Sequence, residues 1–354
     1  MLSYCPQIVE DGVQKGKNIP LKTGLKRGYM PLKEFFVIVH LRASHKVEAW
    51  VYAFEGDYIG YDEVTPKDIQ QYDLVIANTN HIGINYLPKI LSLAEARPKS
   101  VKWVSLIEGS ATDYLKPMPF IRRVLDASDF VNVINHHTLS FFQALTSTPC
   151  EYIGIPYPID AVVKLRVPIE QRFRRAFICP MLSKRWNDYL VAKNLGVEFY
   201  GYEKRITRKL STLKETWLLH RSLNANKYFE FVQSVYADDA LTIRREVGIA
   251  QYLTDNASAR LWINLDDRFT WGRYVLDAAV LHVPIITTRC TGHAEDLFPH
   301  TTLEHEFQIK EAIELGKRLL SDEAFYKMVA EVSEEKLEQF RSDTLKEKLL
   351  SQIC

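Results

Sequence analysis

The stretch 261-LWINLDDRFTWGRYVLDAAVLHVPIITTRCTGHAEDLFPHTTLE-304 decides the fold of this chain. Its apolar pattern predicts a strand, a polar turn, a helix, a second strand and a polar loop. These parts cover residues 261–265, 266–272, 273–281 and 283–288, and the loop carries Gly292, His293 and Glu295. In an open parallel sheet, ligands bind at the edge where the strands end. Both loops therefore belong to one predicted ligand site.

The turn before the helix suits a phosphate group. Trp271, Gly272 and Arg273 would place backbone N–H groups and a cation at the start of the helix. A cation alone is disfavoured there by the helix dipole, so Arg273 makes best sense with a bound anion. The alternative is a surface ion pair between Arg273 and Asp277, which lies four residues further along the same helical face.

This stretch also resembles a known family. A glycine, four residues, an acid, Ala-Ala, a Pro-Ile-Ile strand and a glycine loop with an acid follow one another in that order. The order resembles the donor-binding segment of GT-B glycosyltransferases, especially the family-4-like ones. That family usually has two glutamates eight positions apart. The second falls on Asp277, and the first falls on Phe269.

The resemblance implies an α/β fold of GT-B type, in which two Rossmann-like, doubly wound domains face a central cleft. It implies a nucleotide-sugar donor, expected to be UDP-linked, with no cofactor and no metal ion in the transfer of a hexosyl or pentosyl group. The donor-binding residues that it implies are Lys184, Arg185, Gly272, Arg273, Asp277, His293 and Glu295. Lys184 and Arg185 would meet the diphosphate, and Asp277 would meet the ribose.

Short apolar runs alternate with helical patterns along most of the chain, which favours parallel sheets. Strands are predicted at 34–40, 47–54, 72–78, 101–107, 130–134, 151–155, 176–179, 196–200 and 240–243, besides those quoted above. Two long helices are predicted over 307–320 and 324–340. The predicted domains are an acceptor-binding domain at 1–165, a nucleotide-sugar-binding domain at 166–340, and a C-terminal helix at 341–354 that packs back on the first domain.

Glu108 is the predicted general base, because it directly follows a buried strand at the edge that faces the cleft. The alternative is a turn acid that precedes Gly109. His136 is the second candidate, and His81 and His137 also follow predicted strands. The neighbours His136 and His137 are expected to point in different directions, so no metal site is predicted.

The composition is that of an ordinary globular protein. The 354 residues are 47% hydrophobic and 25% charged, which suggests two domains, and the net charge of +1 gives no global preference for nucleic acid. Five widely spaced cysteines suggest reduced thiols in a cytoplasmic protein. The N-terminus does not resemble a secretory signal, and no apolar run approaches the ~20 residues of a transmembrane helix.

The acceptor stays open at this stage: a glycan, a lipid-linked sugar, a protein and modified DNA are all compatible with the sequence. A DNA glycosyltransferase that acts on hydroxymethylated bases would have the basic segment 15–27 and Arg172, Arg174 and Arg175 beside a duplex. Two other classes are a non-catalytic nucleotide-sugar-binding module, which Phe269 favours, and a sugar-nucleotide epimerase. The role of residues 1–33 is not predicted.

Overall fold

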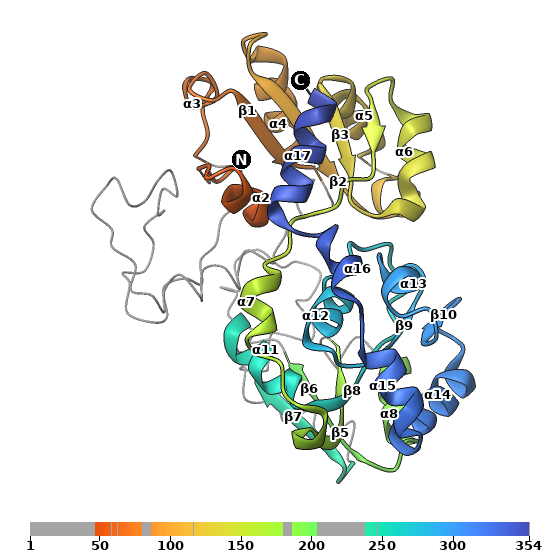
Figure 1. The fold of residues 1–354 in the computed structure, drawn as a ribbon. Coiled ribbons are helices and arrows are strands. Elements are labelled where there is room, and N and C mark those ends of the chain that lie inside the picture. The colour runs from red at the N-terminus through yellow and green to blue at the C-terminus, as the bar shows by residue number, and fades with distance from the viewer. Residues whose placement is uncertain are drawn as a thin grey trace, which may run out of the picture.

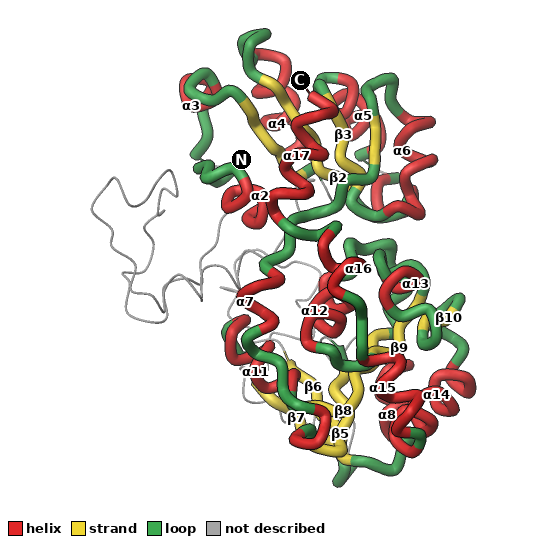
Figure 2. Tube along the Cα trace, viewed as in Figure 1, coloured by secondary structure: helices red, strands yellow, loops and turns green. Residues whose placement is uncertain are grey.

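Two parallel sheets form two lobes, one above the other in Figure 1, and helices flank both sheets in Figure 2. The computed structural model describes residues 47–57, 59–61, 63–79, 86–115, 117–179, 186–203, 238–245 and 247–353. The predicted strand at 34–40 lies outside these residues. No described helix is both long and apolar enough to cross a bilayer.

The first lobe carries a four-stranded sheet in the order β1-β2-β3-β4. Its strands are β1 (Leu74–Asn78), β2 (Lys102–Ile107), β3 (Phe130–Val133) and β4 (Cys150–Glu151). The helical elements are α2 (Val47–Ala53), α3 (Pro66–Ile69), α4 (Leu87–Ala96), η3 (Ala111–Tyr114), α5 (Met118–Asp126), η4 (His136–Thr138) and α6 (Leu139–Leu145). All the pairings are parallel, so the described strands all end at the same edge of the sheet.

The second lobe carries a six-stranded parallel sheet in the order β10-β9-β8-β5-β6-β7. Its strands are β5 (Phe173–Ile178), β6 (Glu198–Glu203), β7 (Leu241–Arg245), β8 (Ala259–Asn264), β9 (Ile285–Thr288) and β10 (Thr302–Leu303). The strand order changes direction between β5 and β8, as in a doubly wound sheet. Ligands of such sheets bind beyond the strand ends at that point.

Helices cover this sheet and connect it to the first lobe. They are α8 (Trp186–Lys193), α11 (Ile249–Ala257), α12 (Arg273–Leu281), α13 (Ala294–Leu297), α14 (Ile309–Ser321), α15 (Glu323–Ala330) and α16 (Glu334–Glu338). The connection contains α7 (Ile159–Val163) and η5 (Ile169–Gln171), and the chain closes with α17 (Ser342–Ile353). Helix α12 has the predicted bounds, and the alternation of strands and helices is confirmed.

The two lobes share one apolar core near the connection. Buried residues of the first lobe, including Trp50, are continuous with Tyr157 and with the core of the second lobe. Helix α17 packs against α2, and Figure 1 shows both on the first lobe. The chain passes between the lobes twice, once before α7 and once before α17. The Tyr157 N–H donates to the carbonyl of Phe340, so these two crossings are hydrogen-bonded to each other. The domain boundary at 165/166 stays a prediction.

The predicted strand at 47–54 is wrong, because this segment forms helix α2. Trp50 and Phe54 stack with their ring centroids 5.9 Å apart, as i and i+4 residues of a helix do. Ala49 and Ala53 repeat the same spacing, and both are buried. A short apolar run carries no period long enough to separate a strand from a helix, so packing decided.

Two further segments differ from the prediction. The strand expected at 151–155 pairs only through Cys150 and Glu151, because the Asn132 side chain then bonds the backbone at Ile153 and Gly154 in place of a neighbouring strand. The helix expected over 324–340 divides into α15 and α16. The Ser333 hydroxyl accepts the N–H of Lys336 and so begins α16 as its N-cap.

The turn before α12 depends on two glycines. Gly272 has φ of +85°, and a Cβ at this position would lie 1.9 Å from the carbonyl oxygen of Gly292. The Gly292 N–H in turn donates to the carbonyl of Thr270 over 2.9 Å. The loops after β8 and β9 therefore touch backbone to backbone at this point.

Gly272→Ala should destabilise the protein by about 2–5 kcal/mol, from left-handed strain and from the overlap with Gly292. Gly248→Ala is the matched control, because Gly248 caps α11 at φ of −63° with open space around it. Urea unfolding measures both. Equal midpoints for the two variants would contradict the close approach.

Candidate functional site

The strand ends of both sheets meet at the junction of the lobes. Glu108 follows β2, and Asn135 and η4 follow β3, all in the first lobe. The turn before α12 follows β8, and the loop before α13 follows β9, in the second lobe. The sequence predicted each of these loops as a strand exit, and the structure brings them together.

Direct hydrogen bonds join the lobes across this junction. The Trp271 N–H donates to Glu108 Oε2 over 3.1 Å. The Asn135 amide donates to the carbonyls of Thr270 and Cys290 over 2.7 and 2.9 Å. Glu108 and Asn135 are both buried, so these bonds are shielded from water. The junction is therefore a specific contact.

The turn before α12 already holds an anionic group. Its Trp271 N–H, at the N-terminal end of the helix, is bonded to the Glu108 carboxylate. A carboxylate there is favoured by the helix dipole, as the sequence predicted for a phosphate. Gly272 is at the predicted place, and its contact with a diphosphate stays a prediction. Lys184, Arg185 and His81 lie outside the described residues.

Asp277 is fully buried and is held by protein groups. It accepts hydrogen bonds from the Tyr157 hydroxyl and from Arg273 Nε, the latter over 3.1 Å. The Arg273 guanidinium lies 5.5 Å from the ring of Tyr252 and 5.1 Å from that of Tyr274. The ion pair that was the alternative for Arg273 is present, but it is buried and not on the surface.

Burial raises the pKa of Asp277, while Arg273 and the hydrogen bond from Tyr157 oppose that rise. Burial and the neighbouring Asp277 charge raise the pKa of Tyr157 well above its ordinary value, so its hydroxyl stays a donor. A ribose contact by Asp277 stays a prediction. It requires the ribose hydroxyl to share or replace one of these two donors.

His293 lies beneath the junction. Its side chain is buried, with Nδ1 2.8 Å from the Tyr152 hydroxyl and the ring edge-on to Phe340 at 4.5 Å. Burial, and to a lesser degree His136, lower its pKa to about 3, so the ring is neutral. Tyr152 and Phe340 belong to the two crossings between the lobes. His293 thus packs against that connection, and its contact with a sugar stays a prediction.

His136, His137 and Glu295 come together across the junction. The expectation that the two histidines point in different directions is wrong, because their ring centroids are only 3.9 Å apart. The reason is the tight 3-10 turn of η4, whose N-cap Asn135 accepts the His137 N–H and also bonds the second lobe. Glu295 Oε2 lies 3.2 Å from His137 Nε2.

Sequence reasoning missed Asn135 and Tyr157 as residues of this junction. Asn135 had a usable signal, since it is the first polar residue after a buried strand, in the same position as Glu108. Tyr157 had no such signal, because its partner Asp277 lies 120 positions away. Phe269 lies edge-on to His137, with the ring centroids 6.3 Å apart.

No family model and no curated protein matches this chain. Among solved structures, S. aureus TarM in complex with Fondaparinux, alpha-GlcNAc-glycerol and UDP is similar, with a TM-score of 0.57 and 12% identity over 81% of this chain. Anabaena Alr3699/HepE in complex with UDP and glucose has a TM-score of 0.56 and 13% sequence identity, over 81% of this chain and 79% of its own. A trehalose-phosphate synthase of Burkholderia xenovorans has a TM-score of 0.59 and 10% sequence identity, over 90% of this chain and 82% of its own.

The chain spans 57% of the length of the TarM chain. At these identities the comparisons show the fold. The neighbours are two-lobed GT-B structures, so the fold class predicted from residues 261–304 is confirmed.

Asp277→Asn should destabilise the protein by about 3–5 kcal/mol, because it leaves the Arg273 guanidinium without its carboxylate in a buried site. Replacing both partners, as Arg273→Met with Asp277→Leu, should cost clearly less than the sum of the two single changes. Chemical unfolding of Arg273→Met, Asp277→Leu and the double variant gives the coupling free energy. Additive losses would show that the pair is not a buried unit.

Stability should fall on acidification through His293. Its folded pKa of about 3 is below the ordinary value of 6.5, so the unfolded chain binds more protons between these values. The stabilisation is complete above pH 6.5 and is lost as the pH falls toward 3. His293→Gln should therefore lower the acid slope of the unfolding free energy, by at most about 1.4 kcal/mol per pH unit. The exposed His300→Gln is the matched control. An unchanged slope in His293→Gln would refute the assignment.

Proposed function

We propose that this protein is a nucleotide-sugar-dependent glycosyltransferase. It transfers a hexosyl or pentosyl group from a UDP-linked donor to a hydroxyl acceptor, and the transfer step uses no metal ion. In this proposal residues 1–165 bind the acceptor, residues 166–340 bind the nucleotide sugar, and 341–354 tie the second domain to the first.

One observation carries the proposal. The point where the second sheet changes direction, between β5 and β8, opens toward the edge of the first sheet that bears Glu108. The turn of Trp271 and Gly272 at this point already binds a carboxylate through backbone N–H, which is the chemistry that a diphosphate needs. The TarM and HepE structures contain bound UDP, which supports a nucleotide donor for this protein.

The residues suggest a sequence of events. A diphosphate at the turn takes the place of the Glu108 carboxylate, which is then released beside the transferred sugar. The acceptor oxygen attacks the anomeric carbon, the bond from that carbon to the phosphate oxygen breaks, and Glu108 takes the acceptor proton. The negative charge left on UDP is stabilised by the helix start at Gly272, together with Lys184 and Arg185. His136 is the second candidate for the base.

A second candidate function is a non-catalytic nucleotide-sugar-binding module. The observation that favours it is the sealed pair of Asp277 and Arg273, together with Phe269 in the place of an acid. The acceptor stays open among a glycan, a lipid-linked sugar, a protein and DNA with hydroxymethylated bases. The net charge of +1 gives no special support to DNA.

A panel of nucleotide sugars separates these proposals. A donor that raises the melting temperature and is slowly hydrolysed supports the transferase, and one that binds without turnover supports the module. Interconversion of the donor without an acceptor would indicate an epimerase. If no donor raises the melting temperature, both donor-binding proposals fail.

Glu108→Gln should lower the transfer or hydrolysis rate by about 10²–10⁴-fold, because the amide cannot take the acceptor proton. The Gln side chain keeps an oxygen that accepts the Trp271 N–H, so the junction should stay intact. The donor should bind at least as tightly as in wild type, because an amide competes less than a carboxylate with the diphosphate for this N–H. The exposed Glu151→Gln is the matched control. Steady-state kinetics measure the effect, and a rate equal to that of the control would exclude Glu108 as the base.

A further inference from the structure

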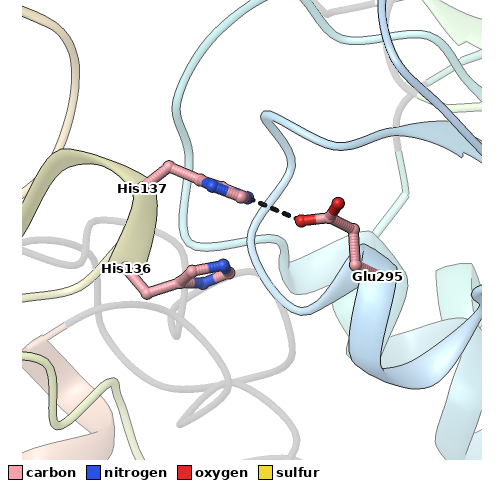
Figure 3. Close-up of side chains that lie close together, drawn as sticks. All are labelled: His136, His137 and Glu295. Atoms are coloured by element: carbon pink, nitrogen blue, oxygen red, sulfur yellow. Dashed lines mark ion pairs between the residues drawn. The ribbon is translucent and has the colours of Figure 1, made fainter.

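Three side chains with metal-ligand chemistry converge from opposite lobes, as Figure 3 shows. His136 and His137 belong to η4 of the first lobe, and Glu295 belongs to α13 of the second. One ligand atom from each of the three lies within 4.8 Å of the others. Within the described part of the chain, this is the group of such residues that could hold a metal ion.

The spacing suits a divalent transition metal. His137 Nε2 and Glu295 Oε2 are 3.2 Å apart. Zinc binds imidazole nitrogen and carboxylate oxygen at about 2.0–2.2 Å in tetrahedral geometry, which separates two ligands by about 3.3–3.5 Å. The His136 ring lies 3.9 Å from that of His137, centroid to centroid, and one of its nitrogens is the third ligand atom. Two imidazoles and one carboxylate also form a zinc ligand set that leaves the fourth position open.

The Nε2 atom of His137 is placed where it could bind a cation. It is buried and makes no hydrogen bond, although it faces the Glu295 carboxylate. A metal ion between these two atoms would be bound by an imidazole nitrogen and a carboxylate oxygen, which are both ligands of zinc.

The charges around the three ligands favour a cation. Arg289 lies 3.7 Å from Glu295, but it also pairs with Glu304 over 2.6 Å. The charges of Arg289, Glu295 and Glu304 together sum to −1, so the site remains attractive to a cation.

The surroundings hold these ligands in place. Asn135 accepts the His137 N–H over 3.0 Å and donates to the carbonyls of Thr270 and Cys290 in the second lobe. The turn that carries the histidines is thereby fixed to the lobe that carries Glu295. Ligands oriented in this way lose little freedom when an ion binds.

We propose that His136, His137 and Glu295 form a site for a divalent transition-metal ion of the zinc class, and that the bound ion ties the two lobes together. The fourth position is open to water or to an oxygen of a ligand in the junction. The site does not depend on the proposed glycosyl transfer, and its test uses no donor.

The test is zinc binding to the full chain after removal of metal by a chelator. Isothermal titration should show a zinc site that His137→Ala and Glu295→Gln each weaken by at least about tenfold, in line with the loss of a ligand. Glu304→Gln is the matched control. It removes a carboxylate from the same Arg289 but no ligand, and its affinity should stay within about threefold of wild type.

Two further measurements keep the result interpretable. Cobalt in place of zinc should give the visible absorption of a tetrahedral site, and Glu295→Gln should remove it. Zinc should raise the melting temperature of wild type and of Glu304→Gln, and not that of Glu295→Gln, which is a substitution at a half-exposed position that should fold. Absence of zinc binding to wild type, or equal binding by wild type and Glu295→Gln, would overturn the proposal.

Discussion

The close approach of two backbone segments governs this structure. At Gly272 no side chain fits, because the carbonyl of Gly292 occupies the space that a Cβ would need. This contact joins the loop after β8 to the loop after β9, and a bridge between Thr270 and Thr291 continues it. The two loops form one surface, and the first lobe docks on that surface through Glu108 and Asn135.

Buried charge gives the junction its specificity. Asp277 and Arg273 lie inside the second lobe, where desolvation makes an ion pair costly unless its hydrogen bonds are complete. Tyr157 completes them from the connection between the lobes. Removal of any one partner leaves a buried polar group unsatisfied, so the position of the connection is coupled to the start of α12. The same arrangement explains why an acid is tolerated in an otherwise apolar helix.

The junction also has a defined electrostatic character. The N–H of Trp271 at the start of α12 favours an anion, and it binds the Glu108 carboxylate in the described structure. Elsewhere at the junction, His137 Nε2 lies 3.2 Å from Glu295 Oε2, and with His136 these side chains form the proposed cation site. An anion site and a cation site thus lie on the same surface. Both depend on Asn135 and on the paired loops for their geometry.

The sequence by itself predicted parallel sheets with alternating strands and helices, because periodicity and turn residues are local properties of the chain. The GT-B class was implied by the resemblance of residues 261–304 to a known family. Residues 261–304 gave helix α12 with its observed bounds, together with the strands on either side. Glu108 and the loops after β3, β8 and β9 were placed correctly at strand ends. Local pattern failed at 47–54, where an apolar run of eight residues packs as a helix.

Only the tertiary structure decided which polar groups neutralise one another. The pairs of Glu108 with Trp271, of Asp277 with Tyr157 and of His137 with Glu295 join residues 120 or more positions apart. No period or spacing in the sequence records such pairs. They arise because two separately wound sheets place their strand ends against each other, and that placement is set by packing over the whole chain.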